Sequence, residues 1–396
     1  MLKNKFRIPK GMSDILFDEC YAKRKIERNL SSLYRELGYR EVITPTVEYM
    51  DVYQNAEIDI EKSYKMIDGK GDIQLLRPDN TVPIARIVGN RLENEKLPLK
   101  LFYNQNIFSL NKINYGKKDE STQNGVELIG DNSIKSDIDI IITAIKAIKK
   151  CNINKFVLEI GHVGIFKELC SGINFHNEDF EKVREYIENK NFAALNDLMS
   201  QYENNAYVTA LKKLPELFGS SETFETAYNV LKNTSAVKYL DYIKEIYDII
   251  KGLDIADKIH IDLGLINEIN YYTGIVFRCY ADDFGDYFLS GGRYDNLIEK
   301  FGKPLPAIGF AIDIDFFCKI TMSEFIEKNE YNIDYVIFYE KGKEKQGYEK
   351  YFDLISKGYK VLISYKNTVE ETKMLCKDIN CKKLIIINEE TKEVTL

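Results

Sequence analysis

The chain has 396 residues, which is enough for two or three domains. Hydrophobic residues make up 44% of it, so a sizeable core can form and global disorder is disfavoured. The formal net charge of -7, from 55 basic and 62 acidic residues, argues against a protein whose main task is to bind RNA phosphates.

Cysteine and histidine usage disfavours a metal site. The seven cysteines are scattered without Cys-x-x-Cys spacing, and there are only three histidines. We therefore expect no metal, no cofactor, and reduced thiols in the cytoplasm. The N-terminus is charged and no run of about 18 apolar residues occurs, so we expect neither a signal peptide nor a membrane span.

The first 50 residues predict a helix followed by a strand. Residues 9–16 contain Pro, Gly, Ser and Asp, which punctuate the chain and can cap the helix after them. Apolar residues then recur on one helical face as far as Leu37, and Gly38 is placed to end the helix. Residues 41–44 are a predicted strand, which Pro45 confines to the edge or end of a sheet.

Polar side chains in residues 75–86 form a candidate binding site. The segment reads Leu-Leu-Arg-Pro-Asp-Asn-Thr-Val-Pro-Ile-Ala-Arg. Asp79 and Thr81 provide a carboxylate and a hydroxyl, which are what an ammonium group needs. The alternative is that Asp79 only caps the helix that follows.

Two strands enclose a polar segment further along the chain. Residues 100–108 and 125–129 are predicted strands, and residues 111–123 are a predicted loop. The first strand ends in Phe-Ser-Leu-Asn, and the second begins near Gln-Asn-Gly-Val-Glu at residues 123–127.

The centre of the chain is mainly helical. Residues 140–149 predict a helix, residues 156–160 a strand, and residues 175–255 a helical block with apolar stripes. His162 follows the strand, and we interpret it as a helix cap or a core residue rather than a catalytic group. The block is either a self-contained subdomain or an oligomer contact.

A pair of tyrosines lies between two further predicted strands, residues 259–263 and 275–280. Tyr271 and Tyr272 are followed by Thr-Gly. Because tyrosine carries an apolar ring with a hydrogen-bonding tip, the pair suits the wall of a small polar pocket. Ordinary packing is the alternative.

The last third holds two motifs and a small domain. Residues 289–297 read Leu-Ser-Gly-Gly-Arg-Tyr-Asp-Asn-Leu, and paired glycines allow backbone to approach a ligand or another chain. From about residue 331, strands at 335–339, 360–365 and 383–388 alternate with helices at 346–357 and 369–378, which predicts a parallel α/β domain. This segment has 12 lysines and 11 acidic residues, and this near-neutral balance gives little support for tRNA binding.

These motifs together resemble the histidyl-tRNA synthetase family of class II synthetases, over roughly residues 5–320. Tyr-Tyr-Thr-Gly-x-Val-Phe resembles its histidine-reading loop, and Leu-Arg-Pro-Asp-x-Thr its segment for the amino group. The helix, strand and proline near residue 45 resemble the first class II motif, at a dimer interface. The resemblance implies a histidine pocket. Its residues would be Asp79, Thr81, Gln123, Glu127, Tyr271 and Tyr272.

The charged catalytic residues of that family are missing. Ser109 stands where an arginine grips the ATP α-phosphate, Asn111 replaces the acid after it, and Asp119 lies near the place of a second arginine. Asn267 replaces the arginine before the tyrosines, and Phe316 the arginine for the γ-phosphate. Adenylate formation depends on such planar, permanently charged groups, so we expect no catalytic residues.

The resemblance also implies the architecture. We expect an α+β fold with a class II synthetase-like, mostly antiparallel sheet flanked by helices, formed by residues 1–174 and 256–322. Residues 175–255 would be a helical insertion. Residues 330–396 would form a C-terminal α/β domain resembling a reduced anticodon-binding domain.

A kept pocket without the chemistry resembles the regulatory subunits of ATP phosphoribosyltransferase, a synthetase-like family of histidine biosynthesis. That implies a non-catalytic protein that self-associates as a dimer, activates a short-form catalytic subunit within a hetero-octamer, and transmits feedback inhibition by histidine. It also implies no nucleic acid or membrane partner. The resemblance permits a histidine site at a subunit interface as well.

Two other functions stay open at this point. A divergent, working histidyl-tRNA synthetase would need arginines at positions 109, 267 and 316, which the sequence lacks. A stand-alone tRNA or histidine sensor would be expected to carry a basic face.

Overall fold

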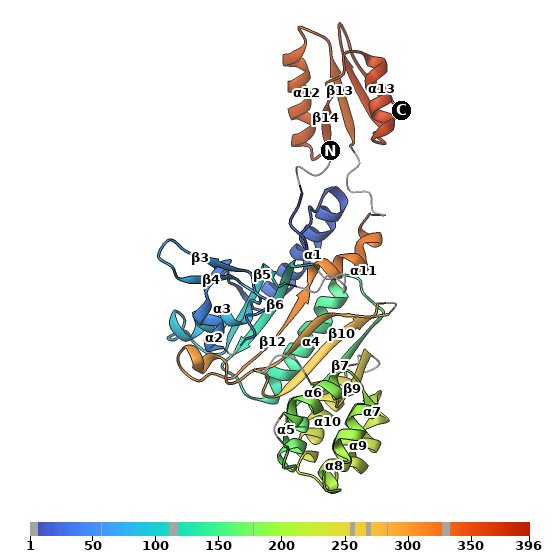
Figure 1. Cartoon of the computed structure of the whole chain (residues 1–396). Coiled ribbons are helices and arrows are strands. Elements are labelled where there is room, and N and C mark those ends of the chain that lie inside the picture. The colour runs from blue at the N-terminus through green and yellow to red at the C-terminus, as the bar shows by residue number, and fades with distance from the viewer. Residues whose placement is uncertain are drawn as a thin grey trace. The chain divides into compact units, whose positions relative to one another are not determined.

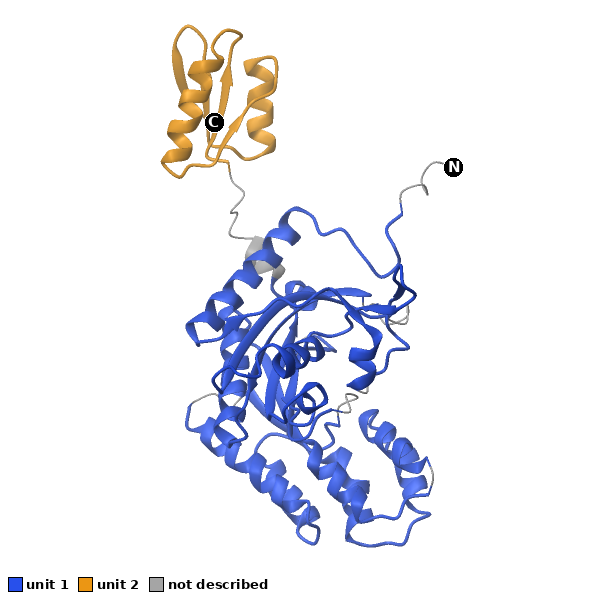
Figure 2. Ribbon diagram, turned by 90° about the vertical axis from the view of Figure 1, so that its left-hand side faces the viewer, with its two compact units in different colours: residues 1–322 blue, residues 323–396 orange. Residues whose placement is uncertain are grey.

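The chain divides into two compact units, Met1–Met322 and Ser323–Leu396 (Figure 2). The computed structural model describes residues 7–56, 58–110, 118–176, 178–253, 258–266, 271–282, 284–326 and 333–396, with the backbone alone at 322–326.

The first unit is built on a sheet of nine described strands (Figure 1). In their order across the sheet they are β1 (Arg40–Glu41), β5 (Leu99–Phe108), β6 (Glu120–Ile129), β12 (Ala307–Asp313), β11 (Tyr287–Arg293), β10 (Ile275–Ala281), β7 (Phe156–His162), β9 (Ile259–Asp262) and β8 (Phe218–Gly219). Only the pairs β1/β5 and β7/β9 are parallel. The predicted mostly antiparallel sheet is therefore confirmed.

Helices cover one face of this sheet. Among them are α1 (Phe17–Glu36), α4 (Ile134–Lys150) and α11 (Ile314–Ile326). The ring of Tyr34 in α1 lies 5.6 Å from Phe102 in β5 and 6.4 Å from Phe310 in β12. Because side chains alternate along a strand, Tyr103 must point to the opposite face.

The opposite face is covered only in part. Over its β5 end lie α2 (Met50–Asn55), α3 (Thr81–Asn90) and η4 (Ile298–Phe301), whose apolar side chains share a core with Leu101 and Tyr103. A small antiparallel sheet continues this layer, with strand order β2 (Val47–Tyr49), β4 (Ile73–Leu76) and β3 (Lys65–Ile67). The cavities described below lie on this face, over β6, β11 and β12.

A helical block follows β7. It comprises α5 (Val163–Ser171), α6 (Asp179–Glu188), α7 (Phe192–Met199), α8 (Ala206–Lys213), η2 (Leu214–Glu216), α9 (Thr223–Leu231) and α10 (Val237–Lys251) (Figure 1). The apolar stripe predicted for α10 is buried at Leu240, Ile243, Tyr247 and Ile250. The strand β8 was not predicted, because its two residues are too few to form a pattern; through it the block joins β9.

The second unit is an α/β/α layer structure. Its strands lie in the order β14 (Val361–Ile363), β13 (Tyr335–Tyr339), β15 (Lys383–Ile387) and β16 (Thr391–Thr395), with α12 (Glu344–Ser356) and α13 (Val369–Asp378) between them in sequence. Two separate apolar clusters lie on the two sheet faces. The antiparallel strand β16 was not predicted, because Thr-Lys-Glu-Val-Thr is an exposed edge with little apolar alternation.

Two predicted boundaries in the first unit are wrong. The strand expected at 41–44 is only β1, because the carbonyls of Thr44 and Pro45 accept from the Arg77 guanidinium instead of a neighbouring strand. The second strand after the polar loop begins at Glu120, not 125, and pairs with the whole length of β5. Its polar residues face the cavities, which made them resemble a loop.

The predicted end of the first helix is confirmed. Helix α1 ends before Gly38, whose φ of +84° suits glycine. All seven cysteines are free thiols. Within the described ranges, no helix has the length and apolar character needed to cross a bilayer.

Candidate functional site

All six residues predicted for a histidine pocket line one cavity of about 60 Å³ on the partly covered sheet face. They are Asp79, Thr81, Gln123, Glu127, Tyr271 and Tyr272. The cavity is completed by Ser290, Tyr294, Gly309, Phe310 and Ala311. They come from the start of α3, from β6, from the segment before β10, and from β11 and β12. Residues far apart in sequence therefore converge on one polar hollow.

Asp79 lies at the turn that leads into α3, and its carboxylate has two roles. Oδ1 accepts a hydrogen bond from the Val82 backbone N–H at 3.1 Å, so the capping interpretation is confirmed. The same side chain lines the cavity. Burial raises the pKa of the Asp79 carboxyl to about 6, against the Val82 hydrogen bond that lowers it.

Glu127 is the most enclosed carboxyl group of the cavity. The Thr81 hydroxyl donates to Oε1 at 3.0 Å, and the Tyr294 hydroxyl donates to Oε2. Burial raises the pKa of this carboxyl to about 8, although both hydrogen bonds lower it. Position 309 opposite must be glycine, because a Cβ there would collide with the Glu127 carboxylate.

Asn80 sets the orientation of Gln123. Its amide nitrogen lies 3.5 Å from the Gln105 carbonyl oxygen, which can only accept, and it donates to Gln123 Oε1 at 3.1 Å. The oxygen end of Gln123 is thereby occupied by Asn80. The amide NH₂ of Gln123 remains as a donor for a group in the cavity.

The tyrosines form an aromatic wall. Tyr271 lies 5.1 Å from Tyr272 and 5.6 Å from Tyr294, measured between ring centroids. The Lys167 ammonium of α5 donates to the Tyr272 carbonyl at 3.0 Å and holds the backbone of the pair. The prediction that this pair lines a pocket wall is met by its position, and Tyr294 is a third member that the sequence analysis missed.

Tyr103 is a second residue that sequence reasoning missed. It is fully buried, and its hydroxyl has no hydrogen-bond partner. It faces Gly125 across the β5/β6 ladder, and a Cβ at 125 would lie 2.5 Å from its oxygen. The glycine thus lets this hydroxyl reach the level of Thr81 and Glu127. Only the register of β5 against β6, which the sequence does not specify, places it there.

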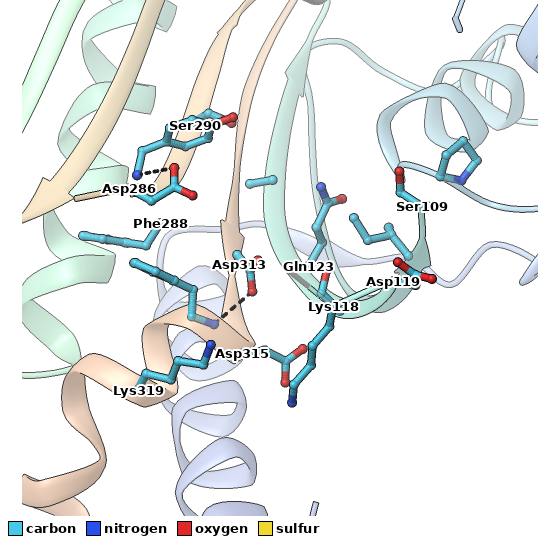
Figure 3. Close-up of a pocket in the computed structure, with 16 residues that line it drawn as sticks. Ser109, Lys118, Asp119, Gln123, Asp286, Phe288, Ser290, Asp313, Asp315 and Lys319 are labelled. Atoms are coloured by element: carbon cyan, nitrogen blue, oxygen red, sulfur yellow. Dashed lines mark hydrogen bonds between the residues drawn. The ribbon is translucent and has the colours of Figure 1, made fainter. Parts of the chain in front are cut away.

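A larger cavity of about 600 Å³ adjoins the small one (Figure 3). Gln123, Ser290 and Ala311 line both. Ser109 and Phe316, which stand at two expected arginine positions, both line the larger cavity. Asp119, near a third such position, lines it too, whereas Asn111 and Asn267 lie outside the described residues.

The larger cavity is acidic and partly aromatic. Its charged lining consists of Lys118, Lys319, Asp119, Asp286, Asp313 and Asp315, and the described lining includes no arginine. The Asp315 carboxylate is held by the Lys23 ammonium and the Thr122 backbone N–H, both at 2.7 Å. Phe316 packs edge-on against Phe284 at 5.8 Å. A triphosphate would therefore face more carboxylates than cations.

Two polar residues of types that are common in active sites have structural roles here. His162 caps α5 through its Nδ1, which accepts from the Gly164 N–H at 2.9 Å, and burial lowers its pKa to about 4. This confirms its assignment as a cap. Arg293 of the Gly-Gly-Arg-Tyr-Asp motif is buried and donates to Asp137 at 2.9 Å through Nε. Across the described part of the chain, no group of three or more His, Cys, Asp or Glu is arranged to hold a metal ion.

Sequence comparisons identify relatives of this chain. The family profile described as histidyl-tRNA synthetase matches residues 11–317. A protein of Clostridium acetobutylicum named ATP phosphoribosyltransferase regulatory subunit is 42% identical over 382 residues, covering 95% of this chain and 94% of the relative. The protein of the same name from Clostridium kluyveri is 40% identical over 386 residues, covering 96% and 98%.

Structure comparisons agree with the sequence matches. A crystal structure from Bacillus halodurans, described as an ATP phosphoribosyltransferase regulatory subunit/histidyl-tRNA synthetase, superposes with a TM-score of 0.84 at 27% identity, over 97% of this chain and 98% of that one. A histidyl-tRNA synthetase from Nostoc gives 0.79 at 17% identity over 99% and 97%, which shows the shared fold alone. The chain belongs to the ATP phosphoribosyltransferase regulatory subunits, a family built on the histidyl-tRNA synthetase fold.

Proposed function

We propose that this chain is a non-catalytic regulatory subunit. It activates a separate, short-form ATP phosphoribosyltransferase in the first step of histidine biosynthesis, and it transmits feedback inhibition by histidine. The names of its relatives support this role. The observation that carries it is the contrast between the two adjoining cavities. The small one gathers side chains for an amino acid, and the described lining of the large one includes no arginine for ATP.

The large cavity is unsuited to adenylate chemistry. Stabilising charge on a pentavalent phosphorus needs fixed cationic donors, and losing one such donor typically costs about 100-fold or more in rate. Ser109 offers a short neutral hydroxyl, and Phe316 is a hydrocarbon packed on Phe284. Losing several donors together should abolish the synthetase reaction.

The small cavity is suited to histidine. The Asp79 carboxylate and Thr81 hydroxyl are acceptors for an ammonium group. Glu127 can accept from an imidazole N–H when ionised, or donate to an imidazole nitrogen when protonated, and the aromatic wall encloses the ring. For feedback, histidine must bind the inhibited state of the complex better, by about 1–3 kcal/mol for a typical coupling.

Self-association is expected through the first unit. Large apolar side chains are exposed near its small sheet, with Ile43 81%, Ile67 75% and Tyr49 52% accessible. Such a group of exposed apolar residues suits a second copy of this chain. We propose a dimer that joins the catalytic subunit in a hetero-octamer, with no nucleic-acid partner.

The test is phosphoribosyl transfer by the short catalytic subunit, measured alone, with this chain, and with this chain plus histidine. Activation by the chain and inhibition by histidine are the expected results. If the chain does not activate, the regulatory proposal fails. Histidine-dependent ATP–pyrophosphate exchange by the chain alone would instead establish a working synthetase.

A further inference from the structure

A bound amino acid brings a carboxylate as well as an ammonium, and the carboxylate needs a cation. In the synthetase resemblance this is the arginine that Ser109 replaces. Two other buried arginines on this side of the unit are engaged elsewhere. The Arg77 guanidinium donates to the carbonyls of Asn106, Thr44 and Pro45. Arg293 is held by Asp137, Ser136 and Asp295. Neither is directed at a ligand.

Arg278 occupies a better position on β10. It is half-buried and lies directly opposite Ser290 of β11, which in turn lies opposite Ala311 of β12. Residues directly opposite one another share a sheet face, so the Arg278 side chain is on the side of the cavities. Ser290 and Ala311 line both cavities. Their short side chains leave room above the sheet for a ligand beside the guanidinium.

Contacts of the guanidinium agree with this placement. It lies 4.9 Å from the ring centroid of Tyr287, which lines the large cavity. Burial raises the pKa of Tyr272, a wall of the small cavity, and the charge of Arg278 acts against that rise. Arg278 itself lines a third cavity with Glu159 and Tyr280, and it lies beside the common floor of the other two because its neighbour Ser290 lines both.

A row of directly paired residues crosses the sheet from the basic Arg278 to the polar and acidic side chains near the small cavity. It runs Arg278, Ser290, Ala311, Gly125 and Tyr103, with Glu127 and Gln123 flanking Gly125 on β6. With strands ~4.8 Å apart, the Ala311 backbone is ~10 Å from that of Arg278. An extended arginine side chain and a small amino acid span that distance together. Glu159 lies opposite Arg278 on its other side, away from the floor, and lines the third cavity with it, so a ligand carboxylate would compete with Glu159 for the guanidinium.

We propose that Arg278 binds the α-carboxylate of the amino acid in the small cavity and replaces the arginine lost at position 109. The inference rests on the proposed histidine site and adds the residue that makes it selective for a carboxylate. A planar guanidinium stacked on Tyr287 is suited to bidentate binding of such a group.

The test compares two ligands on two proteins. Binding of histidine and of histidinol, which has an alcohol in place of the carboxylate, is measured by calorimetry on the full chain, alone and with the catalytic subunit. Arg278→Met should weaken histidine about 10- to 100-fold, because a charged hydrogen bond is lost, and should leave histidinol unchanged. Arg278→Lys should fall between wild type and Arg278→Met, since lysine keeps the charge without the fork.

Controls come from the large cavity. Lys118→Met and Lys319→Met remove its lining lysines and should change the binding of neither ligand. An equal loss for both ligands in Arg278→Met would mean a structural role and would overturn the assignment, as would unchanged histidine binding. Loss of carboxylate selectivity in a lysine variant would move the role to that lysine. Wild-type protein that binds neither ligand would overturn the proposed histidine site itself.

Discussion

The two cavities share part of one floor and differ in what surrounds it. In the small cavity the polar side chains are hydrogen-bonded to one another, as Thr81 and Tyr294 are to Glu127. The rings of Tyr271 and Tyr294 pack together in its aromatic wall. In the large cavity, the positions expected to carry arginine hold Ser109 and Phe316, among several carboxylates. Under the proposed function, recognition and chemistry depend on separate sets of side chains. One set can be replaced while the other stays, because only the floor of Gln123, Ser290 and Ala311 is common.

The largest effect is expected from the buried carboxyl of the small cavity. Burial raises the pKa of Glu127 from 4.5 to about 8, so between these values the folded protein holds a proton that the unfolded chain releases. Stability from this group is therefore present at low pH and is lost as pH rises through about 8. Glu127→Gln should remove that part of the pH dependence, which amounts to several kcal/mol at ~1.4 kcal/mol per tenfold change in proton affinity.

The measurement is the free energy of unfolding in urea between pH 5 and 9, with and without the substitution. His162 acts in the opposite direction, because its pKa is lowered to about 4, but it is present in both proteins and cancels in the difference. Parallel curves for the two proteins would show that Glu127 is not buried as a neutral group.

A smaller effect, on histidine affinity, is expected from substitution of Asp79, and a matched substitution in the large cavity allows the two cavities to be compared. Asp79→Asn removes the charge, and the amide oxygen can still accept from Val82 and cap α3. Histidine affinity should fall about 10- to 100-fold, because an ammonium loses its charged acceptor, and stability should not fall. The matched change in the large cavity, Asp286→Asn, should leave histidine affinity unaltered. Histidine binding to both variants is measured by calorimetric titration. Equal losses of histidine affinity in the two variants would show that the two cavities act as one binding site.

The sequence was sufficient for those parts that motifs or periodicity specify. The six pocket residues follow from the resemblance of short runs such as Leu-Arg-Pro-Asp-x-Thr to the synthetase family, and all six line one cavity. The register of the strands could not be predicted from the sequence, and it is this register that brings Tyr103, Ser290 and Arg278 to the same face of the sheet. The polar residues at the start of β6 predict a loop, and this prediction is wrong because the residues form a strand whose side chains face a cavity.

The smallest effect concerns two buried tyrosines on opposite faces of the sheet. Tyr103 lies on the side of the small cavity and Tyr34 on the helical side, and both hydroxyls are buried without a partner. An unpaired buried hydroxyl costs free energy, so Tyr103→Phe and Tyr34→Phe should each raise the free energy of unfolding by about 1 kcal/mol. In saturating histidine the gain at Tyr103 should shrink, because a ligand in the adjoining cavity can supply the missing partner. The gain at Tyr34 should persist. Denaturant melts with and without histidine measure this, and an unchanged gain at Tyr103 would place its hydroxyl outside the reach of the ligand.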